Sequence, residues 1–163
     1  MSDSSPGENV FLVSTDVETF ERTVASPVEP GDLADPPSAL AGDGAVRLWA
    51  VPEGTRNEES FGRMAPGDLL LFYADGTYVG VGRVGGTFED AEGWAGEALP
   101  DAANVVAVSD FVPLSIGRAA VNALFDYAPS YVPQGLMRVA PERLTARPSS
   151  IEVAVRRYDE QRD

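Results

Sequence analysis

The sequence predicts an α+β domain built on a mainly antiparallel, barrel-like sheet. Short apolar runs typical of strands outnumber the segments with helical spacing, and the two kinds do not alternate regularly as they do in parallel α/β folds. The pair Asp75-Gly76 separates two apolar runs, which is the strongest short-range signal of a β-hairpin. The 163 residues include 16 glycines and 13 prolines, a share typical of a domain rich in turns.

Six apolar segments have the length of strands. In chain order they span residues 10–14, 47–51, 69–73, 78–84, 105–112 and 136–139. We expect the first helix to follow Thr15, which forms a capping-box pair with Glu18. A second, short helix is expected to be capped by Asn57 and ended by Pro66 and Gly67.

Two further helices are predicted in the second half of the chain. They cover residues 115–126 and the segment that begins at Ser150, where apolar residues recur on one helical face. The intervening segments 25–44, 85–103 and 127–133 are rich in glycine, proline or acidic residues, so we predict loops there.

The length is that of one domain, and no internal repeat points to a second. We expect residues 1–8 to be a disordered lead and residues 9–163 to form the single domain. No apolar run reaches the ~18 residues that a membrane helix needs, and the N-terminus lacks the character of a signal peptide. The sequence therefore predicts a cytoplasmic protein with no membrane partner.

Histidine, cysteine and lysine are absent, so all twelve basic residues are arginines. This composition excludes Ser-His-Asp and Cys-His nucleophiles and lysine Schiff bases. It also excludes zinc and iron sites built on histidine or cysteine. The carboxylates show no catalytic spacing. We therefore expect no catalytic residue, no metal and no cofactor, and a protein that is not an enzyme.

The net charge of −14 comes from 26 acidic and 12 basic residues. The carboxylates are scattered singly among small residues, which is typical of halophilic cytosolic proteins. At molar salt the Debye length is ~3 Å, so like charges hardly repel one another. Counterion release then no longer drives phosphate binding. We interpret the acidic composition as a sign of habitat and not as an argument against a nucleic-acid partner.

Several residues have both a structural and a functional interpretation. Gly80 and Gly82 share one strand face, where we favour close packing over the approach of a planar ligand. Trp49 is either a core residue or a stacking face for a ligand. Tyr127 and Tyr131 either pack within their loop or form an exposed stacking surface.

A series of motifs in the middle of the chain resembles a known family. The motifs are Trp49, Arg56-Asn57, Met64-Ala-Pro-Gly67-Asp68, Leu71-Phe72-Tyr73 and Val79-Gly-Val-Gly-Arg-Val84. In this order they resemble the EVE domain of the PUA-like superfamily, in a haloarchaeal type, over about residues 46–84. The stretch Val132-Pro-Gln-Gly-Leu-Met-Arg138 is similar also to modified-base-reading domains associated with restriction endonucleases.

The resemblance implies both a fold and a ligand. The fold would be a PUA-like pseudo-β-barrel with flanking helices. The ligand would be one modified nucleobase, flipped from DNA or presented by RNA, in an aromatic-lined pocket. The resemblance implies binding rather than chemistry, in agreement with the missing catalytic residue types.

We predict that the base-reading site lies between the Trp49 strand and the start of the helix at Asn57. A flipped base offers two faces and one hydrogen-bonding edge, so a reader needs an aromatic face and an amide. Trp49 would supply the face and Asn57 the amide. The other expected contacts are Ser14 and Thr15 after the first strand, Arg56 beside Asn57, Gln134 in the late loop, and Tyr131 or Trp94 as a partial lid.

Two other functions are open at this point. One is a small-molecule or nucleoside hydrolase of the ASCH-like group, which two converging carboxylates in a pocket would favour. The other is a protein-interaction partner in a restriction or toxin system, which an exposed apolar patch without a concave pocket would favour. The sequence predicts neither the base, nor its modification, nor the oligomeric state.

The habitat interpretation predicts that salt stabilises the fold. As KCl is raised from dilute to molar concentration, screening should relieve repulsion among the carboxylates and raise the thermal midpoint of unfolding. Differential scanning calorimetry across a KCl series measures that midpoint. A midpoint that stays flat or falls would contradict the interpretation. The acidic composition would then indicate which partners the protein binds and not its habitat.

Overall fold

The continuous apolar run at the start of the domain forms β1 (Val10–Ser14), a strand paired on both of its edges. The computed structural model describes residues 9–28, 46–52, 54–89, 104–144 and 146–161. β1 lies parallel to β3 (Leu69–Ala74) and antiparallel to β6 (Leu136–Arg138). An interior strand with both faces covered must be apolar throughout, and that is the pattern of this run.

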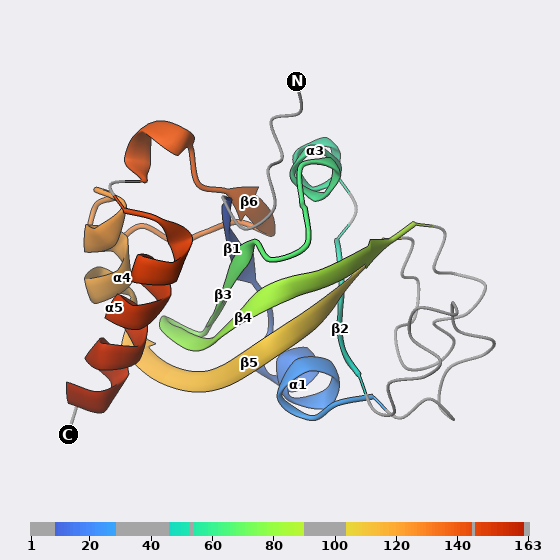
Figure 1. Cartoon of the computed structure of the whole chain (residues 1–163). Coiled ribbons are helices and arrows are strands. Elements are labelled where there is room, and N and C mark those ends of the chain that lie inside the picture. Colours follow the sequence, from blue (N-terminus) through green and yellow to red (C-terminus); the bar gives the residue numbers. More distant parts are fainter. Residues whose placement is uncertain (1–8, 29–45, 53, 90–103, 145, 162–163) are drawn as a thin grey trace.

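The remaining strands complete a six-stranded sheet in the order β2-β5-β4-β3-β1-β6. β4 (Thr77–Phe88) and β5 (Val105–Gly117) are long and pair antiparallel, and β2 (Arg47–Ala50) pairs with β5 at one edge. The β4–β5 register shifts at three points, and such bulges bend the strands. Figure 1 shows both strands curving, which curls the sheet toward a half-barrel.

The predicted hairpin is confirmed. Asp75 and Gly76 join β3 to β4, and both have positive φ, 52° and 81°. Two central residues in this region define the tight turn that matches the twist of paired strands. The prediction that a loop begins at residue 85 is wrong, because β4 continues to Phe88 along the edge of β5.

The helix predicted over 115–126 begins later than expected. β5 continues to Gly117, since β4 offers hydrogen-bonding partners that far, and α4 (Arg118–Leu124) starts only there. α5 (Pro148–Gln161) begins two residues before Ser150. A short 3-10 turn, η5 (Pro141–Arg143), lies between β6 and α5.

The first helix starts as predicted, but its cap is different. Asp16, not Thr15, caps α1 (Val17–Phe20), because its carboxylate accepts the Thr19 amide at 2.9 Å. That hydrogen bond lowers the pKa of Asp16. The chain continues as a π-helical turn, η1 (Glu21–Ala25).

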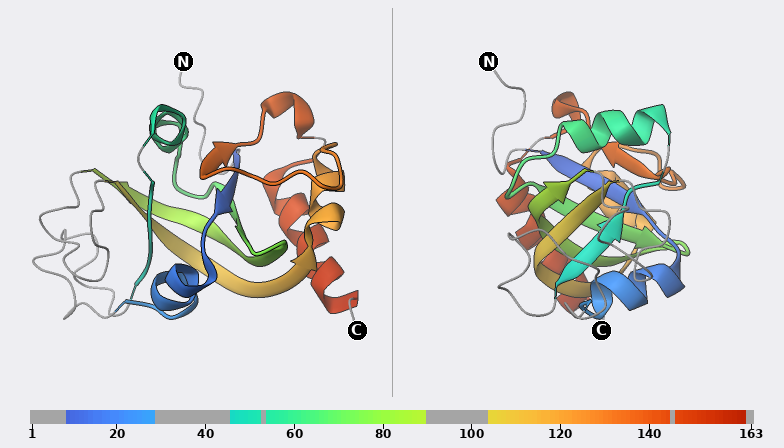
Figure 2. Two further views of the ribbon diagram at one scale, coloured as in Figure 1. Left: turned by 180° about the vertical axis from the view of Figure 1, so that it is seen from behind. Right: turned by 90° about the vertical axis from the view of Figure 1, so that its right-hand side faces the viewer.

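The sheet separates two apolar clusters, because successive side chains of a strand point to opposite faces. Val10 and Leu12 face a cluster that α4 and α5 cover. Phe11 and Val13 face the other, which holds residues of α1, η1, β2 and α3 (Thr55–Gly62). Figures 1 and 2 show α4 and α5 together at one end of the sheet and α3 on the side of β1 and β6.

The close-packing interpretation of the glycine strip is confirmed. A Cβ at Gly80 would meet the Phe111 ring at 2.5 Å, and one at Gly82 would meet the Val108 side chain at 2.7 Å. The space beside both glycines is therefore filled by protein. Phe20, Phe72 and Phe111 form an aromatic cluster there, with ring centres 5.6–6.1 Å apart.

The predicted lead, residues 1–8, lies outside the described residues, as do 29–45 and 90–103 of the predicted loops. Within the part of the chain that the structure describes, no helix is long and apolar enough to cross a membrane.

The hairpin predicts that Gly76→Val destabilises the fold. A β-branched residue is strained at a φ of 81°, so we expect a loss of about 1–3 kcal/mol in the free energy of unfolding, measured by urea titration. Gly117→Val is the matched control, because φ is −59° there. A Cβ meets nothing within 4 Å at either glycine. Equal losses in the two variants would contradict the assigned strain.

Candidate functional site

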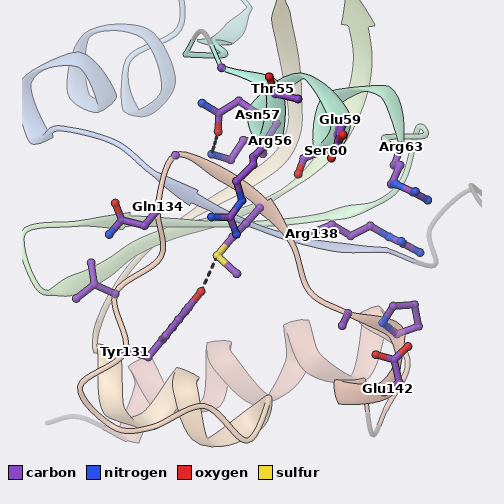
Figure 3. Close-up of a pocket in the computed structure, with 17 residues that line it drawn as sticks. Thr55, Arg56, Asn57, Glu59, Ser60, Arg63, Tyr131, Gln134, Arg138 and Glu142 are labelled. Carbon is purple, nitrogen blue, oxygen red and sulfur yellow. Dashed lines mark hydrogen bonds between the residues drawn. The ribbon is translucent and has the colours of Figure 1, made fainter.

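A groove of about 970 Å³ opens between α3 and the segment that runs through β6 (Figure 3). Seven residues between positions 54 and 63, in and beside α3, line one wall, and ten residues between positions 131 and 142 line the other. Both walls are close in space although some 70 residues separate them in the sequence. The groove therefore depends on the contacts that join these two segments.

Three hydrogen-bonded segments meet at Gly135. Its carbonyl accepts the Ser14 amide at 2.8 Å, which ties it to the end of β1. The next amide, that of Leu136, donates to Asn57 Oδ1 at 2.9 Å, which ties it to α3. Gly135 has a φ of 57°, and a Cβ there would collide with the side-chain Oδ1 of Asn57. The positive φ and the close approach of Asn57 both favour glycine at this position.

The structure corrects the expected roles of Asn57. The residue is the third of α3, which begins at Thr55 after Gly54, so it is not the N-cap. Its side-chain oxygen accepts the Leu136 amide and is already engaged when the groove is empty. Asn57 therefore joins the two walls of the groove, a structural role that its sequence neighbourhood does not indicate.

Tyr131 is held firmly at the groove wall. Its ring stacks on Tyr127 with centres 4.3 Å apart and planes 12° apart, and its hydroxyl donates to Met137 Sδ at 3.0 Å. The Arg143 guanidinium lies over the Tyr127 ring, 4.4 Å from its centre. Burial raises the pKa of Tyr127, so this ring stays neutral. The buried Asn122 amide donates to three carbonyls of the same loop, including that of Tyr131.

The groove gathers positive charge in an acidic protein. Arg56, Arg63 and Arg138 line it, against two carboxylates, Glu59 and Glu142. Figure 3 shows Tyr131 and Gln134 toward one end and Arg63 and Arg138 toward the other, with Arg56 between them. One end thus offers an aromatic ring and an amide, and the other offers guanidinium groups.

The structure brings together four of the predicted site residues. These are Arg56, Asn57, Tyr131 and Gln134, which all line the groove. Ser14 and Thr15 end β1 and are half-buried, but only the Ser14 backbone reaches Gly135. Their contact with a ligand stays a prediction. Trp94 lies outside the described residues.

The prediction that Trp49 offers a stacking face is wrong. Its side chain is 3% exposed and packs in the cluster with Phe11, Phe61 and Val106. β2 pairs along β5, and η1 packs against β2, so this edge strand is covered. Trp49 does not line the groove.

Arg63, Met137, Arg138 and Glu142 line the groove but were not among the predicted site residues. Arg138 had a usable signal, because it ends the Pro-Gln-Gly-Leu-Met-Arg motif that already supplied Gln134. Arg63 and Glu142 stand in sequences without a distinguishing pattern. Within the described ranges, no group of three or more acidic, histidine or cysteine residues could hold a metal.

The curled sheet with its flanking helices is an α+β PUA-like pseudo-β-barrel, as the sequence predicted. The chain is similar to the N-terminal domain of McrB from Thermococcus gammatolerans in a structure bound to m5C DNA. The TM-score is 0.58 and the identity 18%, over 91% of this chain and 97% of that one. An ASCH protein from Zymomonas mobilis gives a TM-score of 0.46 at 12% identity, over 90% and 94%.

No protein-family model matches the sequence, and no curated protein matches it significantly. The structural likeness bears out the PUA-like fold. The narrower resemblance to EVE domains of the haloarchaeal type stays a prediction.

The junction at Gly135 predicts that Asn57→Ala destabilises the protein. The Leu136 amide would lose its partner, which costs about 1–3 kcal/mol for a buried donor. Asn57→Asp is the control, because it keeps an acceptor oxygen at the same place and should retain most of the stability. Urea unfolding measures both variants. An Asn57→Ala variant as stable as the wild type would mean that this hydrogen bond does not hold the walls together.

Proposed function

We propose that this chain is a non-catalytic nucleic-acid-binding module that reads a modified nucleobase in the groove between α3 and β6. The observation that carries the proposal is the composition of the groove. The groove contains the aromatic ring of Tyr131, which stacks on Tyr127, together with the side-chain amide of Gln134 and three arginines. This occurs in a protein of net charge −14.

Tyr131 is suited to stack on a base. Tyr127 supports one face of its ring, and Arg143 lies over Tyr127 in turn. Stacking of one base on an aromatic side chain contributes about 1–3 kcal/mol, and it survives high salt because it does not depend on counterion release. A ring that is already held loses little conformational freedom when it binds.

Gln134 is suited to read the edge of the base. Its side chain is exposed at the same end of the groove as Tyr131, and a glutamine amide presents a donor and an acceptor together. Binding sites that pair polar groups with a ligand reject ligands that leave those groups unmatched. We therefore assign the discrimination among bases to Gln134 in place of Asn57.

We infer that the partner is DNA carrying a modified base. The McrB domain with the same fold was solved bound to m5C DNA, which supports this class of partner. The hydrolase alternative required converging carboxylates. The two carboxylates of the groove, Glu59 and Glu142, come from opposite walls (Figure 3) and not from one catalytic pair of neighbouring positions. The concave groove likewise disfavours a flat protein-interaction surface.

Fluorescence anisotropy in molar KCl tests the proposal. The probes are duplexes with one 5-methylcytosine or another single modified base, matched unmodified duplexes, and the RNA counterparts. We expect at least one modified DNA duplex to bind more tightly than its unmodified form. Tyr131→Leu, which keeps apolar bulk without the ring, should weaken that affinity about 5- to 150-fold. Gln134→Ala should mainly reduce the preference for the modified base.

Tyr158→Leu is the matched control, because Tyr158 is an exposed tyrosine of α5 that does not line the groove. It should bind as the wild type does. The thermal midpoint of each variant shows whether its fold is intact. Equal affinity for all modified and unmodified probes, or an unchanged affinity of folded Tyr131→Leu, would contradict the proposed function.

A further inference from the structure

A fully buried carboxylate lies behind the arginine end of the groove. Asp68 has no exposed surface and accepts three hydrogen bonds. Two come from Asn9, from its backbone amide at 3.2 Å and its side-chain Nδ2 at 3.1 Å, and one comes from the Ala65 amide at 2.9 Å. These bonds fix the position of the Asn9 side chain, which is itself 4% exposed.

Asn9, held in place by Asp68, in turn orients Arg138. Because the Asn9 nitrogen is turned toward Asp68, its oxygen must face the other way. That oxygen accepts Arg138 Nε at 3.0 Å. Nε is the guanidinium nitrogen nearest the aliphatic chain, so its bond sets the direction of the planar group.

The rest of the Arg138 guanidinium differs from that of a structural arginine. Arg83 shows the structural case, since its three nitrogens donate to Glu152 and to the Gly67 carbonyl. Among the described residues, Arg138 has one hydrogen bond, to Asn9, and takes part in no ion pair. Arg138 lines the groove together with Arg56 and Arg63, and no hydrogen bond to a described residue engages its two Nη groups.

We propose that the Arg138 end of the groove binds a phosphate of the nucleic-acid backbone, with Asn9 and Asp68 as positioning residues. This inference rests on the proposed function. Two coplanar N–H donors match two phosphate oxygens. Phosphate contacts place the strand while base contacts specify the sequence. A guanidinium held in advance is most useful at molar salt, where counterion release contributes little and directional hydrogen bonds remain.

Four probes separate this subsite from the base pocket. They are the modified duplex, its unmodified form, the free modified nucleoside without phosphate, and a modified duplex with neutral methylphosphonates flanking the base. Arg138→Gln should weaken both charged duplexes by the same factor, about ten- to a hundredfold. It should leave the nucleoside unchanged and have little effect on the methylphosphonate duplex. Arg157→Gln removes the same charge from an exposed site on α5 and should change none of these affinities.

The positioning claim has its own readouts. Arg138→Lys keeps the positive charge, but it lacks the Nε that donates to Asn9 and the two coplanar Nη donors. We therefore expect this variant to bind the duplexes nearly as weakly as Arg138→Gln. Asn9→Ala should weaken duplex binding in the wild-type background and have no further effect in the Arg138→Gln background, because the two residues act as one unit. If Asn9→Ala fails to fold, the comparison of lysine with glutamine at position 138 decides alone.

The two proposals fail in different ways. If the wild type prefers a modified duplex but Arg138→Gln binds both duplexes within twofold of the wild type, the phosphate subsite is overturned and the base reader stands. If Arg138→Lys binds the duplexes as tightly as the wild type, the positive charge alone accounts for the phosphate contact. The positioning role of Asn9 and Asp68 is then wrong. If the wild type binds duplexes without preference, yet loses them on Arg138→Gln, the base reader fails and the subsite stands. No duplex binding at all overturns both.

Discussion

β1 is paired on both edges, and this pairing sets the geometry of the groove. Its antiparallel register with β6 places Val13 opposite Leu136 and Phe11 opposite Arg138. The C-terminal end of β1 thus holds the Gly135 junction and with it α3, while the residue before β1, Asn9, holds Arg138. One short buried strand therefore determines how far apart the aromatic end and the arginine end of the groove lie.

The groove concentrates positive charge in a protein that is acidic overall. The carboxylates outnumber the arginines overall, but the groove has three arginines against two carboxylates. Its arginine end and its aromatic end are both supported from behind, by Asn9 and by Tyr127 respectively. In the proposed function, this support would favour stacking and directional hydrogen bonds, which need only the correct placement of a few groups and do not depend on long-range attraction.

The sequence predicted the elements whose signals are local. β1 and the turn at Asp75-Gly76 follow from apolar runs and from residues that tolerate positive φ. The extent of β5 was not predictable in this way, because it depends on how far β4 provides partners. For the same reason the role of Asn57 was not predictable from local sequence, because its partner Leu136 is 79 residues distant.

Of the predicted site residues, those from the late loop and from the Arg-Asn pair line the groove, whereas Trp49 does not. Their contact with a ligand stays a prediction. A tryptophan in a short strand carries no local sign of which neighbours will cover it, and η1 and β5 cover Trp49. Arg138 was not among the predicted site residues, although it ends the motif that supplied Gln134. Its hydrogen bond to Asn9, 129 residues earlier in the chain, has no local signal in the sequence.

The most direct test of the account is to map the binding surface by NMR, for which a chain of 17.3 kDa is well suited. Amide and arginine side-chain signals are followed as a duplex containing 5-methylcytosine is added at high salt. The account predicts the largest shifts in residues 54–60 and 131–138, with the Arg138 Nε signal among them and α5 unaffected. Shifts centred on α4 and α5, or on β2 around Trp49, with the groove unchanged, would contradict it.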